Sequence, residues 1–384
     1  MTARRFGVRV AATVAVPVVA LWTVPVQATA QAANGCAPAE STVVSPLPWA
    51  VRRLDAARVW PLTRGAITVA VVDTGVSAAA PTLAGAVLPG SDVDGGPANT
   101  DCAGHGTFLA GLIAARPVTD VGFVGVAPAA TILPVRVTND PSSVNADRLA
   151  AGIQLAVDAG ARVIAVGLIN TTDSPALRAA IASAHDHDAL VVAPAAVRQS
   201  DQHAFPASLD GVLAVAPVGP NGPTTATLGA RPTLAAPAEQ LVGIGPSGPG
   251  HRLATGPELA VGYAAAAAAL LRDRAPTLTA AQTTTRLTTT ADAPAAPTPT
   301  IGAGIVDPVA AVTTITGSPH HPPLAAEHLT IPPQATVDTT PTRNALWFVI
   351  ALTATALLIT AVVTAVTQAR RRANKPDGGP APQR

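Results

Sequence analysis

The sequence predicts an α/β fold, in which a parallel β-sheet is flanked by helices and one further apolar helix lies near the C-terminus. Three observations support this prediction. Apolar strand-like runs alternate with helical patterns through the body of the chain, polar turn motifs follow the strands, and an uncharged run occupies residues 345–366. Parallel strands need long crossover connections, which helices usually provide.

The alternation begins at residues 67–72, where β-branched residues and alanine predict a strand buried on both faces. Further strands are expected over residues 131–137, 162–169, 189–193 and 211–218. Helices are expected over residues 108–115, 145–159, 174–187, 259–274 and 279–290. The helix at 259–274 is alanine-rich and apolar on all sides, which predicts that it is buried.

The start of the chain is typical of a secretory signal peptide. Three arginines precede an uncharged run over residues 10–26, and small residues that fit an A-x-A cleavage site follow, up to position 32. An uncleaved anchor of the same length is the alternative. Because prolines interrupt the run and a cleavage site is present, we expect residues 1–32 to be removed.

A second apolar run predicts a transmembrane helix over residues 345–366. Its 22 residues carry no charge, and at about 1.5 Å per residue such a helix spans the hydrocarbon layer. Basic residues within 367–384 favour a cytoplasmic tail, and the proline- and threonine-rich residues 313–344 predict an extended linker. We therefore expect a single-pass protein of the cell membrane, with its main domain on the extracytoplasmic face.

The residues between these ends predict one domain at 65–312, preceded by an extension at 33–64. The net charge of +1 gives no reason to expect nucleic-acid binding. The two cysteines, Cys36 and Cys102, predict one disulfide in an oxidising compartment. The histidines show no metal-ligand spacing with carboxylates or cysteines. We therefore expect neither a metal site nor a cofactor.

Two polar motifs contain candidate active-site residues. Asp73, in Val-Val-Asp-Thr-Gly, ends the first predicted strand, and His105, in Gly-His-Gly-Thr, precedes the first predicted helix. Parallel sheets usually carry active-site residues at the C-terminal ends of their strands. A buried aspartate can orient a histidine ring so that the ring acts as a general base.

In order and spacing, these motifs resemble those of the subtilisin-like serine peptidases, the subtilases. The resemblance implies a subtilisin-like fold, with Asp73 and His105 as the aspartate and histidine of a catalytic triad. Residues 48–50, 58–65 and 305–308, with the signal peptide, linker and membrane helix, resemble the mycosins. These are membrane-anchored subtilases associated with type VII secretion. A cysteine in the extension that pairs with one just before the histidine motif also fits that group.

The nucleophile departs from the family pattern. Subtilases carry it in a G-T-S-x-A-x-P motif that opens a buried helix, and an ungapped alignment places Glu258 at the serine position. Thr255 and Ser247 are alternative hydroxyl groups, but Thr255 lies three residues too early and Ser247 lies in a Pro/Gly-rich loop. Loss of the serine costs about a million-fold in rate in a subtilisin.

Two further positions lack the family's polar groups. Val197 stands where subtilases place the asparagine that stabilises the oxyanion, and residues 165–167 replace an N-x-S sequence. Loss of the oxyanion donor alone costs about 100- to 1000-fold in rate. Two placements are open for Glu258: beside His105, where it would raise the pKa of the ring, or facing outward as a helix cap.

We therefore expect a catalytically inactive scaffold or interaction component of type VII secretion, associated with its membrane complex or with secreted substrates. The alternative is an active serine endopeptidase that processes secreted substrates.

Overall fold

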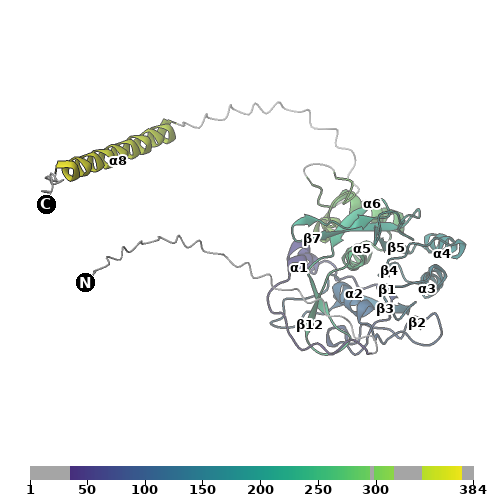
Figure 1. Ribbon diagram of the computed structural model, residues 1–384. Coiled ribbons are helices and arrows are strands. Elements are labelled where there is room, and N and C mark those ends of the chain that lie inside the picture. Colours follow the sequence, from purple (N-terminus) through teal and green to yellow (C-terminus); the bar gives the residue numbers. More distant parts are fainter. Residues whose placement is uncertain (1–34, 295–297, 315–339, 374–384) are drawn as a thin grey trace, which may run out of the picture. The chain divides into compact units, whose positions relative to one another are not determined.

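The computed structural model describes residues 35–294, 298–314 and 340–373. Its main sheet has the strand order β10-β7-β5-β4-β1-β3-β2, and every pair along this path is parallel (Figure 1). Strand β8 adds an antiparallel pair at β7, which makes the sheet mixed. The strands are β1 (Thr68–Asp73), β2 (Ser91–Asp92), β3 (Thr131–Arg136), β4 (Val163–Val166), β5 (Leu190–Pro194), β7 (Leu213–Gly219), β8 (Gly222–Pro223) and β10 (Leu234–Pro237).

Helices cover both faces of the sheet, and the side chains of β1 alternate between the two cores. Val69 and Val71 join the core that contains α2 (His105–Ala114) and α5 (Ala260–Arg274). Ala70 and Val72 join the core that contains α3 (Ala146–Asp158) and α4 (Pro175–Asp186). This two-residue period follows from the pleat of the strand, and the continuous apolar run follows from burial on both faces.

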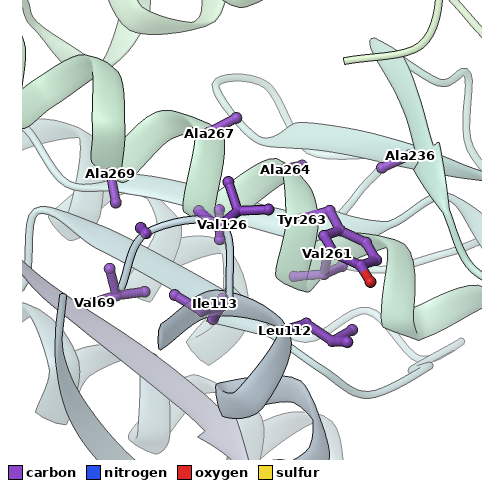
Figure 2. Packing of buried hydrophobic residues seen from close by; sticks show 14 of the residues in the cluster. Val69, Leu112, Ile113, Val126, Ala236, Val261, Tyr263, Ala264, Ala267 and Ala269 are labelled. Atoms are coloured by element: carbon purple, nitrogen blue, oxygen red, sulfur yellow. The ribbon is translucent and has the colours of Figure 1, made fainter. Parts of the chain in front are cut away.

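Helix α5 forms the centre of the first core, as predicted from its alanine content. Each alanine from Ala264 to Ala269 is fully buried, because methyl side chains let the neighbouring elements approach the helix closely. Leu112 and Ile113 of α2 point toward it from below, and Tyr263 lies at the same interface (Figure 2). The helix starts one residue later than expected, after a 3-10 turn, η3 (Pro257–Leu259).

Other predicted elements differ at their ends or were missed. Helix α2 begins at His105 instead of at residue 108, and β4 ends at Val166 instead of at residue 169. The helix predicted at 279–290 is α6 (Ala280–Thr289). The missed elements are short and include, besides β2 and β8, the strands β6 (Ala196–Val197), β9 (Thr227–Leu228), β11 (Leu241–Ile244) and β12 (His251–Ala254) and the helix α7 (Pro308–Thr313). Their apolar residues span too few positions to establish a period.

The predicted N-terminal extension packs on the domain along its length. The Cys36–Cys102 disulfide is present, and the backbone N–H of Ala37 donates to the carbonyl of Cys102 at 2.7 Å. Further along, α1 (Trp49–Leu54) places the Trp49 indole N–H 3.0 Å from the carbonyl of Glu239. The short helix η1 (Ala56–Val59) then leads to β1.

The predicted membrane segment lies within α8 (Thr340–Ala373). Residues Ala345–Arg370 have a mean hydropathy of 2.4 and are long and apolar enough to cross a membrane. The predicted signal peptide at 1–32, most of the linker at 313–344 and residues 374–384 of the tail lie outside the described residues.

Candidate functional site

The site begins where β1 ends and α2 starts. Asp73 is the last residue of β1 and is fully buried, and His105 is the first residue of α2. The His105 Nδ1 atom lies 2.8 Å from Oδ1 and 2.9 Å from Oδ2 of Asp73. The structure therefore brings together the aspartate and histidine that the two motifs predicted.

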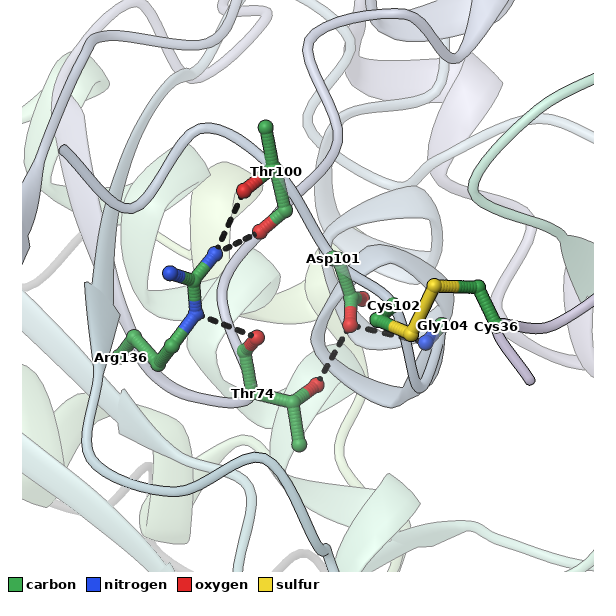
Figure 3. The surroundings of a disulfide bond; sticks show 7 residues. All are labelled: Cys36, Thr74, Thr100, Asp101, Cys102, Gly104 and Arg136. Carbon is green, nitrogen blue, oxygen red and sulfur yellow. Dashed lines mark hydrogen bonds between the residues drawn. A yellow bond between two sulfur atoms is a disulfide. The ribbon is translucent and has the colours of Figure 1, made fainter. Parts of the chain in front are cut away.

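A second buried carboxylate holds this arrangement in place. Asp101 accepts hydrogen bonds from the Thr74 hydroxyl at 2.9 Å, from the Gly104 N–H at 2.8 Å and from the Thr107 N–H at 2.8 Å. Figure 3 shows Asp101 between Thr74 and Gly104, beside the disulfide of Cys102. Sequence reasoning missed this role of Asp101. The sequence pattern that could have indicated it is an acidic residue three positions before a Gly-His motif. That pattern is too common to be interpreted alone.

Gly106 lets α2 approach the turn after β1. A Cβ atom added at Gly106 would lie only 2.1 Å from the carbonyl oxygen of Gly75. Any side chain there would push the first turn of α2, and with it His105, away from Asp73. The second glycine of the motif is therefore needed for the Asp73–His105 contact.

Glu258 lies on the other side of the His105 ring. It is in η3, directly before α5, and its Oε1 atom is 3.5 Å from His105 Nε2. The side chains of His105 and Glu258 are only 17% and 20% exposed. Of the two placements that the sequence left open, the structure has the one beside His105.

The two carboxylates change the protonation of the ring. Burial alone favours the neutral imidazole, but the negative charges of Asp73 and Glu258 outweigh that effect and raise the pKa of His105 to about 10. At neutral pH the ring is therefore an imidazolium held between two carboxylates. In this state His105 has no free lone pair with which to accept a proton from a hydroxyl.

Neither alternative hydroxyl is paired with His105. The Thr255 hydroxyl accepts a hydrogen bond from the backbone N–H of Gln240 at 2.9 Å. Ser247 lies in the loop against the extension, where its carbonyl accepts from the Glu40 N–H at 3.0 Å. Within the described part of the chain, the polar contacts of the His105 ring go to Asp73 and Glu258.

The other two altered positions are apolar. Val197 is 4% exposed and packs in the α3–α4 core, where its Cγ1 would lie 2.4 Å from a Cβ atom added at Gly229. A Cβ atom added at Gly167 would lie 2.0 Å from Oδ2 of Asp73. The carboxylate of Asp73 thus occupies the space that a side chain at position 167 would need.

A small cavity of about 90 Å³ opens beside the pair, and His105, Arg252, Thr255 and Glu258 are among its lining residues. Within the described chain, no group of three or more histidine, cysteine or acidic residues could hold a metal ion. Among the described residues, the site therefore offers a partly buried Asp–His–Glu cluster with a protonated ring, a small cavity, and no nucleophile in contact with the ring.

Comparisons with known proteins agree with this fold. The profile of the Subtilase family matches residues 64–306. Mycosin-4 of Mycobacterium tuberculosis is 36% identical over 309 residues, which cover 68% of each chain. The solved structure of MycP1, a serine protease described as an essential component of the type VII (ESX-1) secretion system, matches at 30% identity and a TM-score of 0.64. That match covers 74% of this chain and 94% of MycP1.

A chain of an intact ESX-5 inner membrane complex is also similar. It is 28% identical, with a TM-score of 0.63, and the match covers 87% of this chain and 94% of that chain.

Proposed function

Because the chain belongs to the subtilase family, we propose that it is a catalytically inactive, membrane-anchored member that acts in type VII secretion as a scaffold or interaction component. The observation that carries this proposal is the contact between His105 Nε2 and Glu258 Oε1 at 3.5 Å. In a serine protease that nitrogen receives the proton of the nucleophile. Here it faces a second carboxylate, which adds to the effect of Asp73 in raising the pKa of the ring.

Glu258 is a poor replacement for the missing serine. Attack by a carboxylate on a peptide bond would form an anhydride and would need oxyanion donors for the tetrahedral intermediate. Val197 supplies no such donor. The same cluster is well suited to a structural role, since it ties the start of α5 to the start of α2 and the end of β1.

The membrane-anchored part of the proposal rests on residues 345–370 and on the relatives. This segment is long enough to span a bilayer, and the arginines at its C-terminal end favour a cytoplasmic tail. The domain then lies on the extracytoplasmic face. The similarity to a chain of an ESX-5 inner membrane complex supports association with such an assembly.

Three measurements on the full chain test the proposal. A fluorophosphonate label and a peptide-cleavage assay should give the same background signal for the wild type and for His105→Ala. In cells that lack the protein, His105→Ala should still restore secretion when the amount of folded protein is matched to that of the wild type, since the proposed role needs the folded domain and not a catalytic ring. Labelling at Thr255 or Ser247, or cleavage that His105→Ala abolishes, would establish the alternative, an active serine endopeptidase.

A further inference from the structure

A cavity far from His105 takes no part in the proposed function. It has a volume of about 270 Å³ and lies between α4 and α6. Its floor is apolar, and the side chains that form it are nearly inaccessible: Ile181 is 6% exposed, Val191 2% and Val212 8%. Because Ala184 and Ala280 have only methyl side chains, a hollow remains between the two helices.

This cavity lies at the N-terminal ends of the parallel strands, whereas the Asp73–His105 pair lies at their C-terminal ends. Val191 is the second residue of β5 and Val212 directly precedes β7, whereas Asp73 is the last residue of β1. Strands β1, β4, β5 and β7 are parallel. Their N-terminal ends therefore lie together on one side of the sheet, and their C-terminal ends lie together on the other side. A ligand in this cavity would therefore not touch the cleft that holds His105.

The rim of the cavity carries negative charge. Asp210 is exposed and lines the cavity, and its carboxylate has no ion-pair or hydrogen-bond partner in the described part of the chain. A second hollow of about 410 Å³ shares four lining residues with the first, Ile181, His185, Asp210 and Gly211, and Asp186 is among those that it adds. The single arginine that lines the second hollow, Arg178, already forms an ion pair with Asp173. The Asp186 carboxylate lies 3.6 Å from Nδ1 of His185. The joined hollows thus combine an apolar floor with one rim carboxylate, that of Asp210, which pairs with no side chain in the described part of the chain.

We propose that this cavity binds a partner segment that places a branched aliphatic or phenyl side chain next to a lysine or arginine. The apolar side chain would fill the hollow, since a cavity of about 150 Å³ already holds a benzene-sized ligand. The cation would lie against Asp210 at the rim. Burial of apolar surface supplies affinity, and the carboxylate selects segments that carry positive charge.

Methyl NMR on the full chain in detergent micelles, with isoleucine δ1 methyls labelled, tests this inference. The probes are acetyl-Leu-Arg-amide and its acidic counterpart acetyl-Leu-Glu-amide. We expect the basic probe to shift the Ile181 methyl saturably and to bind about tenfold more tightly than the acidic one, as for one charge-assisted contact. The methyls of Ile113 and Ile244, in the opposite core near α2, should not move.

Two pairs of variants complete the test. Ala281→Leu adds bulk at the exposed wall of the cavity on α6 and should abolish the Ile181 shift, whereas Ala179→Leu, on the exposed side of α4 outside both hollows, should leave it intact. Asp210→Asn should remove the preference for the basic probe, and Asp201→Asn should preserve it. The inference fails if Ile181 shows no saturable shift, if both probes bind equally, or if Ala281→Leu has no effect. None of these results bears on whether the His105 site cleaves peptides.

Discussion

His105 holds a proton that a catalytic histidine must release before it can act as a base. Replacement of Glu258 by glutamine removes one of the two negative charges beside the ring, and we expect the pKa of His105 to fall from about 10 by about one unit or more. Titration of the His105 ring by NMR measures this directly. Glu239→Gln changes a glutamate that does not touch the ring and should leave the titration unchanged.

The sign of the effect on stability follows from the same shift. Because the folded state raises the pKa of His105 above the ordinary value of 6.5, its protonation stabilises the fold fully below that value. This contribution is lost as the pH rises toward about 10. We therefore expect the advantage of the wild type over Glu258→Gln in free energy of unfolding to shrink as the pH rises across this range. An advantage that grows with pH would show that Glu258 does not pair with the ring.

A single reversal at position 258 should not create a protease. We expect Glu258→Ser to show no more peptide cleavage than the wild type, because Val197 still offers no oxyanion donor and residues 165–167 still lack the polar groups of the N-x-S sequence. A cleavage assay on the full chain, with Glu258→Ala as the control for loss of the carboxylate, measures this. Turnover by Glu258→Ser alone would mean that an oxyanion donor exists elsewhere in the cleft.

At the scale of elements, the C-terminal end of α5 is fixed by a buried cation. Arg272 is fully buried and donates to the carbonyls of Arg162 at 2.7 Å and Asp188 at 2.8 Å, besides its ion pair with the Asp188 carboxylate. We expect Arg272→Met to lower the free energy of unfolding by about 3 kcal/mol, since these acceptors lose their partner. Chemical denaturation of the full chain in detergent measures the loss. Arg274→Met, at an exposed position two residues later, should change it by less than about 0.5 kcal/mol.

The elements that carry the site were predictable because each has a strong local signal. The β-branched run before Asp73 and the alanine-rich run after Glu258 allow only a buried strand and a buried helix. The hairpin of β11 and β12 had no such signal, because four-residue strands next to glycines and prolines show no clear period. The contact between Glu258 and His105 was not predictable either, since a side-chain rotamer at a helix start depends on tertiary packing.

At the scale of the whole molecule, one buried histidine of the domain accepts a hydrogen bond from the extension. The buried His251 accepts a hydrogen bond at Nδ1 from the Val44 N–H at 3.1 Å, and burial lowers its pKa. The docked state therefore favours the neutral ring. The neutral ring stabilises docking above about pH 6.5, and this stabilisation is lost as the pH falls below that value and the ring becomes protonated. We expect hydrogen exchange at residues 42–45, corrected for intrinsic rates, to increase as the pH falls from about 7.5 to about 5. Equal protection at both values in the wild type would contradict this assignment.

The disulfide connects that extension to the loop directly before His105, so its loss should act on both. Cys36 and Cys102 are 66 residues apart, and on the chain-entropy model a loop of this size contributes about 4 kcal/mol to stability. We expect Cys36→Ser/Cys102→Ser to lose most of this amount in chemical denaturation and to show faster exchange at residues 37–44. Because Asp101 anchors the loop independently through Thr74 and Thr107, the pKa of His105 should stay raised in this variant. If the His105 pKa falls with the disulfide, then the covalent link, and not the Asp101 network, positions the ring.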